Sequence, residues 1–441
     1  MSHLRACFIR VEVKKREFVS RLDLAIELVR RGVPVIIGEC YDYKELLKFV
    51  GDRGYFFGKC AQPNTLNLFE PLLDHGWNFG ALDEEGLLPD NFETFATTRF
   101  SFKSANTYKD IFFFGDNQKK AFEKIYGPRD SFIVSGNPRI DMWVSKCYSL
   151  YDELQQSIQN KYGNFILLPL NFAYYTNKAI ETPEDKDHQL IYKILADKAE
   201  FIFDNFCKLA ERFANEEKIK VIMRPHPADD PKVIKKLMAK HGIKSQMVEC
   251  VVTHDVFPWI SAAKILFHNC CTTSLEAGFI GTPVLSYMPN NVSLYKNDEV
   301  NNLFPKVKNY EDALAFSANI GNDFSSNFKN KVATWESLSL KNSGRTASFI
   351  ADKILQRNKF EPIQNFNIRK YNIDIKRLKF ELKAKISSII GRHQNNVYLN
   401  KFPRTNVDEV KNIVYNICKY RGYNDQLKIR SINSRLFCIT S

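Results

Sequence analysis

The sequence lacks the marks of membrane-spanning, secreted and metal-binding proteins. No apolar run approaches the roughly 18 residues that a helix needs to span a bilayer. The first residues, MSHLRACFIRVEVKKRE, carry charges where a signal peptide is apolar. The ten cysteines contain no CxxC pair, so we expect reduced thiols and neither disulfides nor a zinc site. We therefore expect a cytoplasmic protein that holds no metal or other cofactor.

Two nucleotide-binding motifs are also missing. The chain has no GxxxxGK[ST] loop and no GxGxxG at its first strand–helix turn, which excludes P-loop and dinucleotide-binding proteins. The net charge of +13 favours an anionic partner, but charge alone does not distinguish nucleic acid, a membrane surface and anionic sugars. The basic residues concentrate in the C-terminal tail and the aromatic residues lie in apolar strand patterns. We therefore expect no nucleic-acid binding.

Short apolar strands alternate with helical segments along most of the chain. The 441 residues, 44% of them hydrophobic, are enough for two cores. The strand-like segments are 6–13, 33–38, 54–57, 77–82, 110–114 and 131–135 in the first half and 165–170, 220–224, 246–252, 265–267 and 283–287 in the second. This alternation predicts an α/β fold with two doubly wound, Rossmann-like parallel sheets. The expected domains are 1–150, 151–358 and a basic helical extension at 359–441.

The segment 264–288, KILFHNCCTTSLEAGFIGTPVLSYM, predicts a strand, a polar turn, a helix and a second strand. Thr272 or Thr273 stands at the N-cap, and Glu276 follows Thr273 at capping-box spacing. The free N–H groups and the positive dipole end of such a helix form a seat for a phosphate or a sugar carboxylate.

The strand 220–224 ends in Arg224-Pro225-His226-Pro227. The carboxyl ends of parallel strands line the ligand crevice, and the two prolines hold the chain extended around His226. We therefore expect this strand end and the helix start to face one anionic ligand, although a lone histidine is more often structural. The expected donor-side residues are Arg224, His226, Pro227, His268, Asn269, Thr272, Thr273, Ser274 and Glu276, with Asn171 as a further polar group after the strand 165–170.

Three acids, Asp83, Glu84 and Glu85, directly follow an apolar strand of the first half. A carboxylate at a strand end can take the proton from an acceptor hydroxyl or stabilise a positively charged sugar centre. Glu84 and Glu85 are the preferred candidates for this catalytic role, with His226 on the other side. The alternative is that the acids only cap the next helix.

Other basic groups of the chain have two interpretations each. Arg139 follows Gly136-Asn137-Pro138 at another strand end, where a guanidinium either binds a carboxylate or phosphate or forms a surface salt bridge. Arg16, near the first strand–helix junction, can reach the acceptor side. The basic segment 370–392 has apolar residues at helical spacing. It predicts a helix that lies on an anionic membrane or packs on the protein body with a charged outer face.

Six segments in this order carry a family resemblance: VEVKKREFVSRLDLAIELVRRGVPVIIG, ALDEEGL, FFFGDNQ, VSGNPRID, MRPHP and HNCCTTSLEAGFIGTPVLSY. Together they resemble the bacterial surface carbohydrate biosynthesis proteins, a group related to the capsule and O-antigen Kdo transferases, which use CMP-Kdo. The resemblance covers about residues 6–350. It implies the GT-B architecture, in which two Rossmann-like domains face each other across a cleft.

The resemblance also implies roles for individual residues. Glu84-Glu85-Gly86 would be the acid-acid-Gly motif of the acceptor-side domain, and His226-Pro227 the His-Pro motif that holds the cytidine nucleotide. His268 with Thr273-Ser274 would bind the donor's phosphate or carboxylate. Some transferases of this kind are thought to use an aspartate nucleophile near the start of the second domain. This chain has Asn171 there, which leaves the double-displacement route and the donor sugar open.

The expected function is a glycosyltransferase that moves an acidic sugar, Kdo or a relative, from a CMP donor to a surface polysaccharide or lipid-linked glycan. The expected location is the cytoplasm, with possible peripheral attachment to the inner membrane. No metal is needed if helix N-termini, arginine and histidine neutralise the leaving phosphate. The alternatives are transfer of glycerol or ribitol phosphate from a CDP donor, as in teichoic-acid polymerases, and a non-catalytic glycan-binding scaffold.

Overall fold

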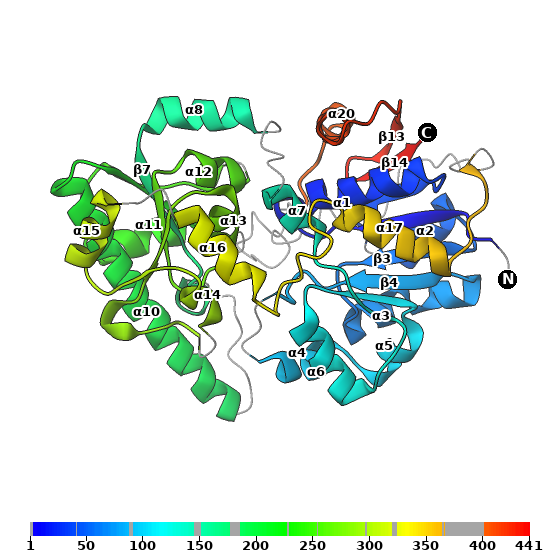
Figure 1. Cartoon of the computed structure of the whole chain (residues 1–441), viewed down its shortest axis with the longest axis horizontal. Helices are drawn as coiled ribbons and strands as arrows, with labels where there is room; N and C mark the ends of the chain where they lie inside the picture. The colour runs from blue at the N-terminus through cyan, green and yellow to red at the C-terminus, as the bar shows by residue number, and fades with distance from the viewer. Residues whose placement is uncertain are drawn as a thin grey trace, which may run out of the picture. The chain divides into compact units, whose positions relative to one another are not determined.

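A computed structural model divides the chain into two compact units, each described here by itself (Figure 1). Unit 1 comprises Met1–Leu150 and Trp335–Ser441, and unit 2 comprises Tyr151–Thr334. The structure describes residues 3–40, 42–87, 91–144, 151–176, 186–226, 229–253, 255–295, 298–319, 324–363, 366 and 401–441.

Unit 1 is built on an eight-stranded sheet with the order β13-β14-β2-β1-β3-β4-β5-β6. The strands β1 to β6 pair in parallel, and β14 pairs antiparallel with both β2 and β13. The strands are β1 (Ala6–Arg10), β2 (Val35–Gly38), β3 (Gly54–Gly58), β4 (Asn78–Leu82), β5 (Asp110–Phe113), β6 (Phe132–Val134), β13 (Lys428–Asn433) and β14 (Leu436–Thr440).

Helices cover this sheet and shield its apolar strands from water. They are α1 (Lys14–Arg30), α2 (Tyr43–Phe49), α3 (Pro63–Phe69), the 3-10 helix η1 (Glu70–His75), α4 (Phe92–Arg99), α5 (Phe102–Thr107), α6 (Asp116–Tyr126), α7 (Pro138–Val144), α17 (Thr346–Arg357) and α20 (Val407–Arg421). Aromatic side chains fill much of the core: the ring of Phe56 lies 4.5 Å from that of Phe69 and 5.3 Å from that of Phe79. Such rings bury large apolar areas, the main favourable term in folding.

The chain returns to unit 1 at Trp335, earlier than the expected domain end at 358. The physical reason is the packing of α17, which contacts α1 and α7 of unit 1. Asp141 fixes this contact, because its carboxylate accepts hydrogen bonds from the backbone N–H and the hydroxyl of Thr346, at 2.6 and 2.9 Å.

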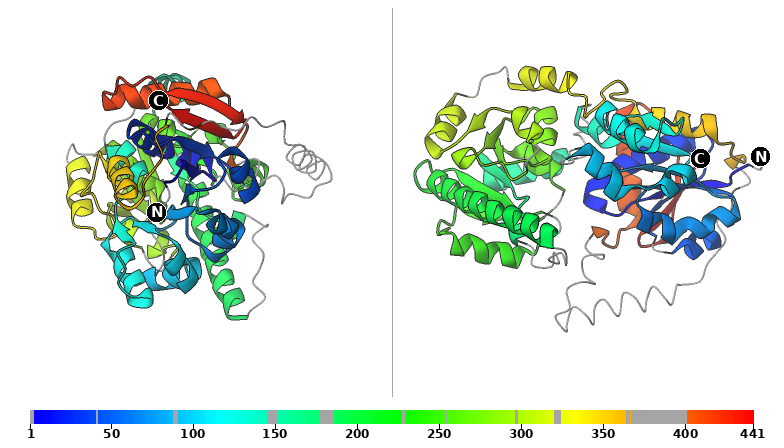
Figure 2. Two further views of the ribbon diagram at one scale, coloured as in Figure 1. Left: turned by 90° about the vertical axis from the view of Figure 1, so that its right-hand side faces the viewer. Right: turned by 90° about the horizontal axis from the view of Figure 1, so that it is seen from below.

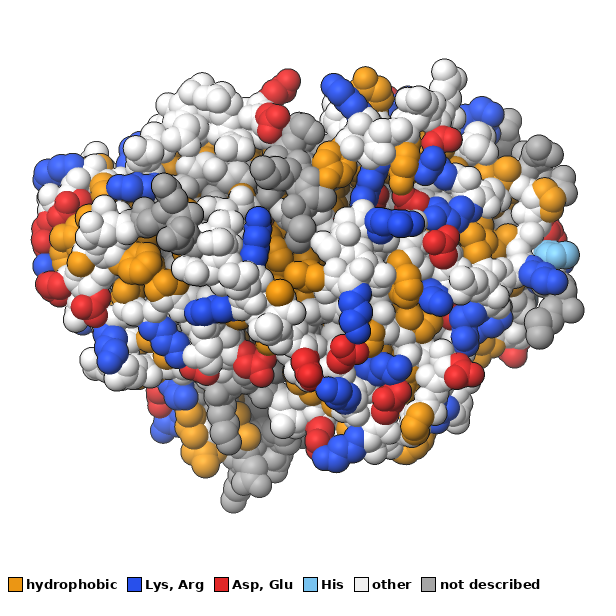
Figure 3. Space-filling view, viewed as in Figure 1, with side chains coloured by type: hydrophobic (Ala, Val, Ile, Leu, Met, Phe, Trp, Pro, Cys, Tyr) orange, Lys and Arg blue, Asp and Glu red, His pale blue; other side chains and the backbone are white. Residues whose placement is uncertain are grey.

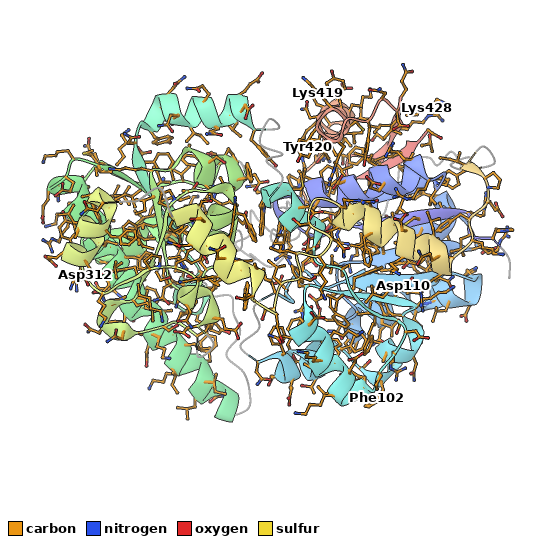
Figure 4. The ribbon with its side chains drawn as sticks, viewed as in Figure 1. Phe102, Asp110, Asp312, Lys419, Tyr420 and Lys428 are labelled. Atoms are coloured by element: carbon orange, nitrogen blue, oxygen red, sulfur yellow. The ribbon has the colours of Figure 1, made fainter. Side chains whose placement is uncertain are left out.

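The C-terminal segment differs from the expected helical extension, because it ends in a β-hairpin. Leu436 and Phe437 of β14 are fully buried, and β14 continues the unit 1 sheet beside β2 (Figure 2). The apolar run Leu436–Thr440, preceded by a polar turn, explains why this segment forms a strand. Lys419 of α20 and Lys428 of β13 are exposed (Figure 4). The basic helix expected at 370–392 lies outside the described residues.

Unit 2 is built on a six-stranded parallel sheet with the order β12-β11-β10-β7-β8-β9. Its strands are β7 (Phe165–Pro169), β8 (Lys220–Arg224), β9 (Val248–Cys250), β10 (Ile265–His268), β11 (Val284–Tyr287) and β12 (Lys306–Val307). Its helices are α8 (Asp152–Tyr162), α9 (Ala173–Thr176), α10 (Lys186–Asn215), α11 (Pro231–Lys240), α12 (Phe257–Ala262), α13 (Thr273–Ile280), the 3-10 helix η3 (Pro289–Asn291), α14 (Glu299–Asn302), α15 (Tyr310–Ala318) and α16 (Phe324–Ala333).

Each sheet has one point at which the strand order reverses. In unit 2 the chain runs from β7 to β8 and β9 on one side, then crosses to β10, β11 and β12 on the other. In unit 1 the reversal falls between β1 and β3. Ligands of doubly wound sheets bind at the carboxyl ends of the strands at this point. The topology therefore directs attention to the residues that follow β7 and β10, and to those that follow β1 and β3.

The surface and helix composition add two observations. In the part of the chain that the structure describes, no helix is both long and apolar enough to cross a bilayer. On the face drawn in Figure 3, lysine and arginine side chains lie among aspartate and glutamate side chains. The excess of positive charge is therefore interspersed with negative charge on this face.

Candidate functional site

The loop after β10 lies at the strand reversal of unit 2 and is held by asparagine side chains. Asn171, just after β7, donates from Nδ2 to the carbonyl oxygens of Asn269 (2.9 Å) and Cys270 (3.2 Å). Asn301 accepts the N–H of Cys270 at 2.8 Å. Cys270 has a φ of +54°, a conformation that costs a non-glycine residue energy. These bonds compensate that cost and fix the loop.

Asn269, expected on the donor side, supports the loop from inside. Its side chain is fully buried, donates to the carbonyl oxygens of Tyr287 (3.0 Å) and Val292 (2.9 Å), and accepts the N–H of Leu294 (2.9 Å). This side chain therefore determines where the loop lies.

The loop leads into α13, whose first turn matches the expected helix start only in part. Thr272 is the N-cap, and its side chain makes no cap hydrogen bond. Ser274 is buried and donates from its hydroxyl to the Cys271 carbonyl at 2.6 Å, whereas Thr272 is exposed and Thr273 half-buried. Of the three residues, Thr272 and Thr273 are those that offer surface to a ligand.

His268 is a structural histidine, contrary to the expectation that it borders the ligand. It is fully buried, its Nε2 lies 3.0 Å from the Ser286 hydroxyl oxygen, and its Nδ1 accepts the N–H of Cys271 at 3.4 Å. Burial disfavours the charged imidazolium and lowers its pKa to about 3. A neutral His268 thus supports the loop before α13 through its bond to Cys271.

Arg224 and His226 lie at the end of β8 with different exposure. Arg224 is buried and donates from Nη1 to the carbonyl oxygen of Thr253 at 2.9 Å. Burial lowers its pKa to about 10, against the opposite effect of the Asp255 and Glu276 carboxylates, so it stays charged at neutral pH. Glu276 belongs to the first turn of α13, which places Arg224 near that helix start.

His226 follows Arg224 and is exposed. Its backbone N–H donates to Oδ2 of Asp229 at 3.0 Å, a residue that the sequence pattern did not single out. Pro227, the other half of the expected His-Pro motif, lies outside the described residues. Unit 2 therefore brings Arg224, His226 and the α13 start to the carboxyl edge of one sheet.

In unit 1 the three acids after β4 each pair with a different arginine. Asp83 accepts two hydrogen bonds from Arg99, both at 2.9 Å. Glu84 is buried and lies 2.7 Å from Nη2 of Arg21. The three acids therefore have different surroundings, and the cap of the next helix, α4, is Asn91, whose side chain accepts the N–H of Thr94.

Glu85 pairs with Arg16 at 2.7 Å, and its side chain is 45% exposed. Partial burial alone would raise the pKa of Glu85, but the charge and hydrogen bond of Arg16, together with the charges of Lys59 and Arg99, outweigh it and the pKa is lowered. Glu85 is thus a charged carboxylate with solvent access, next to the Arg16 named from the sequence.

Asn137 and Arg139 complete the surroundings of Glu84. Asn137 donates from Nδ2 to Oε2 of Glu84 at 3.2 Å and accepts the N–H of Arg139 at 2.8 Å. Burial favours the neutral form of Glu84, yet the charges of Arg21, Arg139 and Arg16 lower its pKa. Arg139 is 9% exposed, which does not fit a surface salt bridge.

Gly136, which precedes Asn137, is required by the fold. Its φ is +79°, and a Cβ at this position would lie 2.8 Å from the Ser339 carbonyl oxygen. Any side chain would therefore push apart two segments of unit 1.

The strand reversal of unit 1 carries charged residues that the sequence pattern did not single out. Glu12, after β1, contacts Nζ of Lys59, after β3, and lies 2.6 Å from Nζ of Lys401. Burial opposes ionisation of Glu12, but the two lysines lower its pKa to about 2. Lys401 comes from the C-terminal segment, far away in sequence, so no local motif could reveal this contact.

Comparisons with known proteins bear on the fold. No protein-family model matches the chain, and a search of curated proteins finds no similar sequence. Among solved structures, the UDP-GlcNAc 2-epimerase from Methanocaldococcus jannaschii aligns with a TM-score of 0.53 at 12% identity, over 80% of this chain and 100% of that one. The UDP-GlcNAc 2-epimerase from Neisseria meningitidis, bound to UDP-GlcNAc, gives 0.50 at 13%, over 80% and 100%. Another UDP-N-acetylglucosamine 2-epimerase gives 0.52 at 15%, over 80% and 96%.

At such low identity the likeness establishes the fold alone. The chain has the two-domain, Rossmann-like α/β fold of the GT-B type that the strand pattern predicted.

Proposed function

We propose that the protein is a nucleotide-sugar-dependent glycosyltransferase that moves an acidic sugar, Kdo or a relative, from a CMP donor to a bacterial surface polysaccharide or lipid-linked glycan. The observation that carries the proposal is that Arg224 and His226, at the end of β8, lie at the same carboxyl edge of the unit 2 sheet as the α13 start after β10. Enzymes of the same fold, such as the Neisseria meningitidis 2-epimerase, are solved with a nucleotide-sugar.

The donor side of the proposal relies on anion chemistry. The N–H groups at the start of α13 and its positive dipole end suit a phosphate or a sugar carboxylate. Arg224 keeps its charge in a buried position, where electrostatic interactions are stronger than in water. Arg224 and His226 would stabilise the CMP leaving group as negative charge develops on its phosphate. This chemistry requires no metal ion.

The acceptor side of the proposal assigns the base to Glu85. A general base must be deprotonated and within reach of the substrate. Glu84 is buried with both oxygens engaged, by Arg21 and by Asn137, whereas Glu85 is charged and exposed. We therefore assign Glu84 to holding the loop and Glu85 to taking the proton of the acceptor hydroxyl.

A thermal-shift titration with CMP, CDP, UDP and GDP tests the donor assignment. We expect saturable stabilisation by CMP, and weaker stabilisation of His226→Ala at the same CMP concentration. Absence of stabilisation by any of the four nucleotides would contradict the enzyme proposal and favour a glycan-binding scaffold. Stabilisation by CDP, with transfer of glycerol or ribitol phosphate seen by product mass, would instead support the teichoic-acid type of reaction.

A second candidate function is epimerisation of a UDP-sugar, favoured by the fold likeness to three UDP-GlcNAc 2-epimerases. This candidate predicts stabilisation by UDP rather than CMP. It also predicts conversion of UDP-GlcNAc without any glycan acceptor, which NMR of the product sugar detects.

Glu85→Gln provides the test of the base. We expect transfer to fall at least a hundredfold, in the range of a lost general base, while CMP-dependent stabilisation is kept. Glu93→Gln is the matched control, since Glu93 is an exposed acid of the same unit that pairs with Lys124 at 2.6 Å, and it should transfer normally. Full activity of Glu85→Gln would refute the base assignment.

A further inference from the structure

The backbone of His226 is held by one buried carboxylate, that of Asp229. Asp229 is 8% exposed. Its Oδ2 accepts the N–H of His226 at 3.0 Å, and its own N–H donates to the His226 carbonyl at 2.9 Å. These two reciprocal bonds join His226 to Asp229.

The other oxygen of Asp229 ties this pair to the segment after β7. Oδ1 lies 2.8 Å from the hydroxyl of Thr176, the last residue of α9. Thr176 is 2% exposed, and its hydroxyl oxygen also lies 3.0 Å from the Phe172 carbonyl oxygen. Asp229 therefore links the segments that follow two adjacent strands, β7 and β8.

The anchor at the α9 end of this bridge is firm. The Tyr175 hydroxyl lies 2.7 Å from Nε2 of His241, whose Nδ1 lies 2.9 Å from Asp204. These contacts tie α9 to α11 and α10, which compensates for its length of only four residues. The contact with Thr176 therefore ties Asp229 and His226 to a helix that is itself anchored in unit 2.

We propose that Asp229 is a positioning residue for His226: with Thr176 it fixes the backbone of His226 and so the position from which the imidazole reaches the donor phosphate. This inference rests on the proposed function, because it assigns His226 a ligand. Loss of the buried Asp229 carboxylate leaves the N–H of His226 without this partner and removes the link to Thr176, so the backbone of His226 is no longer tied to α9.

The chemistry of the bridge distinguishes two substitutions. Asp229→Asn keeps it, since the amide oxygen can accept the His226 N–H and the amide nitrogen can donate to Thr176, which then donates to Phe172. Asp229→Ala removes both contacts. A matched control is Asp230→Ala, because Asp230 is exposed and its side chain accepts the N–H of Lys232 at the start of α11.

Isothermal titration with CMP tests the inference on wild type, His226→Ala, Asp229→Ala, Asp229→Asn, Asp230→Ala and the Asp229→Ala/His226→Ala double variant. We expect Asp229→Ala to weaken CMP binding roughly tenfold or more, as for loss of a buried charged hydrogen bond. Asp229→Asn and Asp230→Ala should bind as wild type does. The double variant should bind no more weakly than His226→Ala alone, since Asp229 acts through His226.

Three results would overturn the positioning role: wild-type affinity in Asp229→Ala, failure of Asp229→Asn to restore binding, or additive losses in the double variant. If Asp229→Ala does not fold, Thr176→Val removes the same tether by loss of one hydroxyl and should weaken binding in the same direction. Failure of the proposed function appears earlier and separately, as wild-type protein that does not bind CMP.

Discussion

Asp83, Glu84 and Glu85 are adjacent in sequence, yet burial separates their roles. Glu84 is 4% exposed and pairs with Arg21, which is 2% exposed, while Glu85 keeps solvent access. A charge in a dry site is tolerated only with a partner, so removal of one member leaves the other uncompensated. Two acids that look equivalent in sequence therefore differ: Glu84 is structural, and Glu85 is available for chemistry.

We predict that Glu84→Gln destabilises the protein by about 3 kcal/mol at neutral pH, as for a broken buried ion pair. The pKa of Glu84 is lowered in the folded state, so its stabilisation is present above its ordinary pKa of 4.5 and is lost as the pH falls. The deficit of the variant should therefore shrink below pH 4.5. Denaturant unfolding over this range measures it, and equal stability at pH 7 would contradict the assignment.

His268 gives a second prediction at the residue scale. Here the pKa is lowered by burial and not by neighbouring charges. Its folded-state pKa of about 3 lies below the ordinary 6.5, so below pH 6.5 the unfolded chain takes up a proton that the folded protein does not. As the pH falls through that range, this group should lower the free energy of unfolding by roughly 1.4 kcal/mol per pH unit. His268→Asn, which can still accept the Cys271 N–H, should remove this part of the slope. An unchanged slope between pH 6 and pH 4 would show that His268 is accessible to protons.

At the scale of elements, the C-terminal hairpin covers the edge of the parallel sheet. Unpaired edge strands expose N–H and C=O groups that promote aggregation, and β14 pairs with β2 along the whole length of β2. Gly38, at the end of β2, permits this contact. Its φ is +139°, and a Cβ would lie 1.9 Å from the Arg435 carbonyl oxygen.

We predict that Gly38→Ala disrupts the pairing of β2 with β14. Gly32→Ala is the control, because Gly32 also has a positive φ, +84°, but a Cβ there meets nothing within 4 Å. The control should lose about 1 kcal/mol from backbone strain, and Gly38→Ala clearly more. Hydrogen exchange of residues 436–440 should rise only in Gly38→Ala; equal behaviour of the two variants would contradict the contact.

The sequence was sufficient for the elements and less so for their contacts. Alternating apolar runs and helix ends predicted β7, β8, β10, β11 and α13 close to their observed bounds, because those signals are local. The burial of His268 and the contact of Lys401 with Glu12 depend on segments distant in sequence. Asp229 carried a weak local signal, an aspartate three residues after His226 that can accept its N–H, as in side-chain turns.

At the scale of the whole chain, two doubly wound sheets supply two strand reversals with different chemistry. In unit 2 the reversal adjoins the α13 start, and a buried arginine and an exposed histidine follow the neighbouring strand β8. The reversal in unit 1 carries Glu12 with Lys59 and Lys401, and Glu12 is close in sequence to Arg16, which pairs with Glu85. This division fits a nucleotide on unit 2 and an acceptor on unit 1, as proposed above.

Hydrogen–deuterium exchange of the full chain with and without saturating CMP tests the central claim most directly. The account predicts slower exchange in peptides that cover 224–230 and 268–276, and weaker protection of these peptides in His226→Ala at the same CMP concentration. Protection confined to other segments, or no protection at a CMP concentration that stabilises the protein, would contradict a nucleotide site at the strand reversal of unit 2.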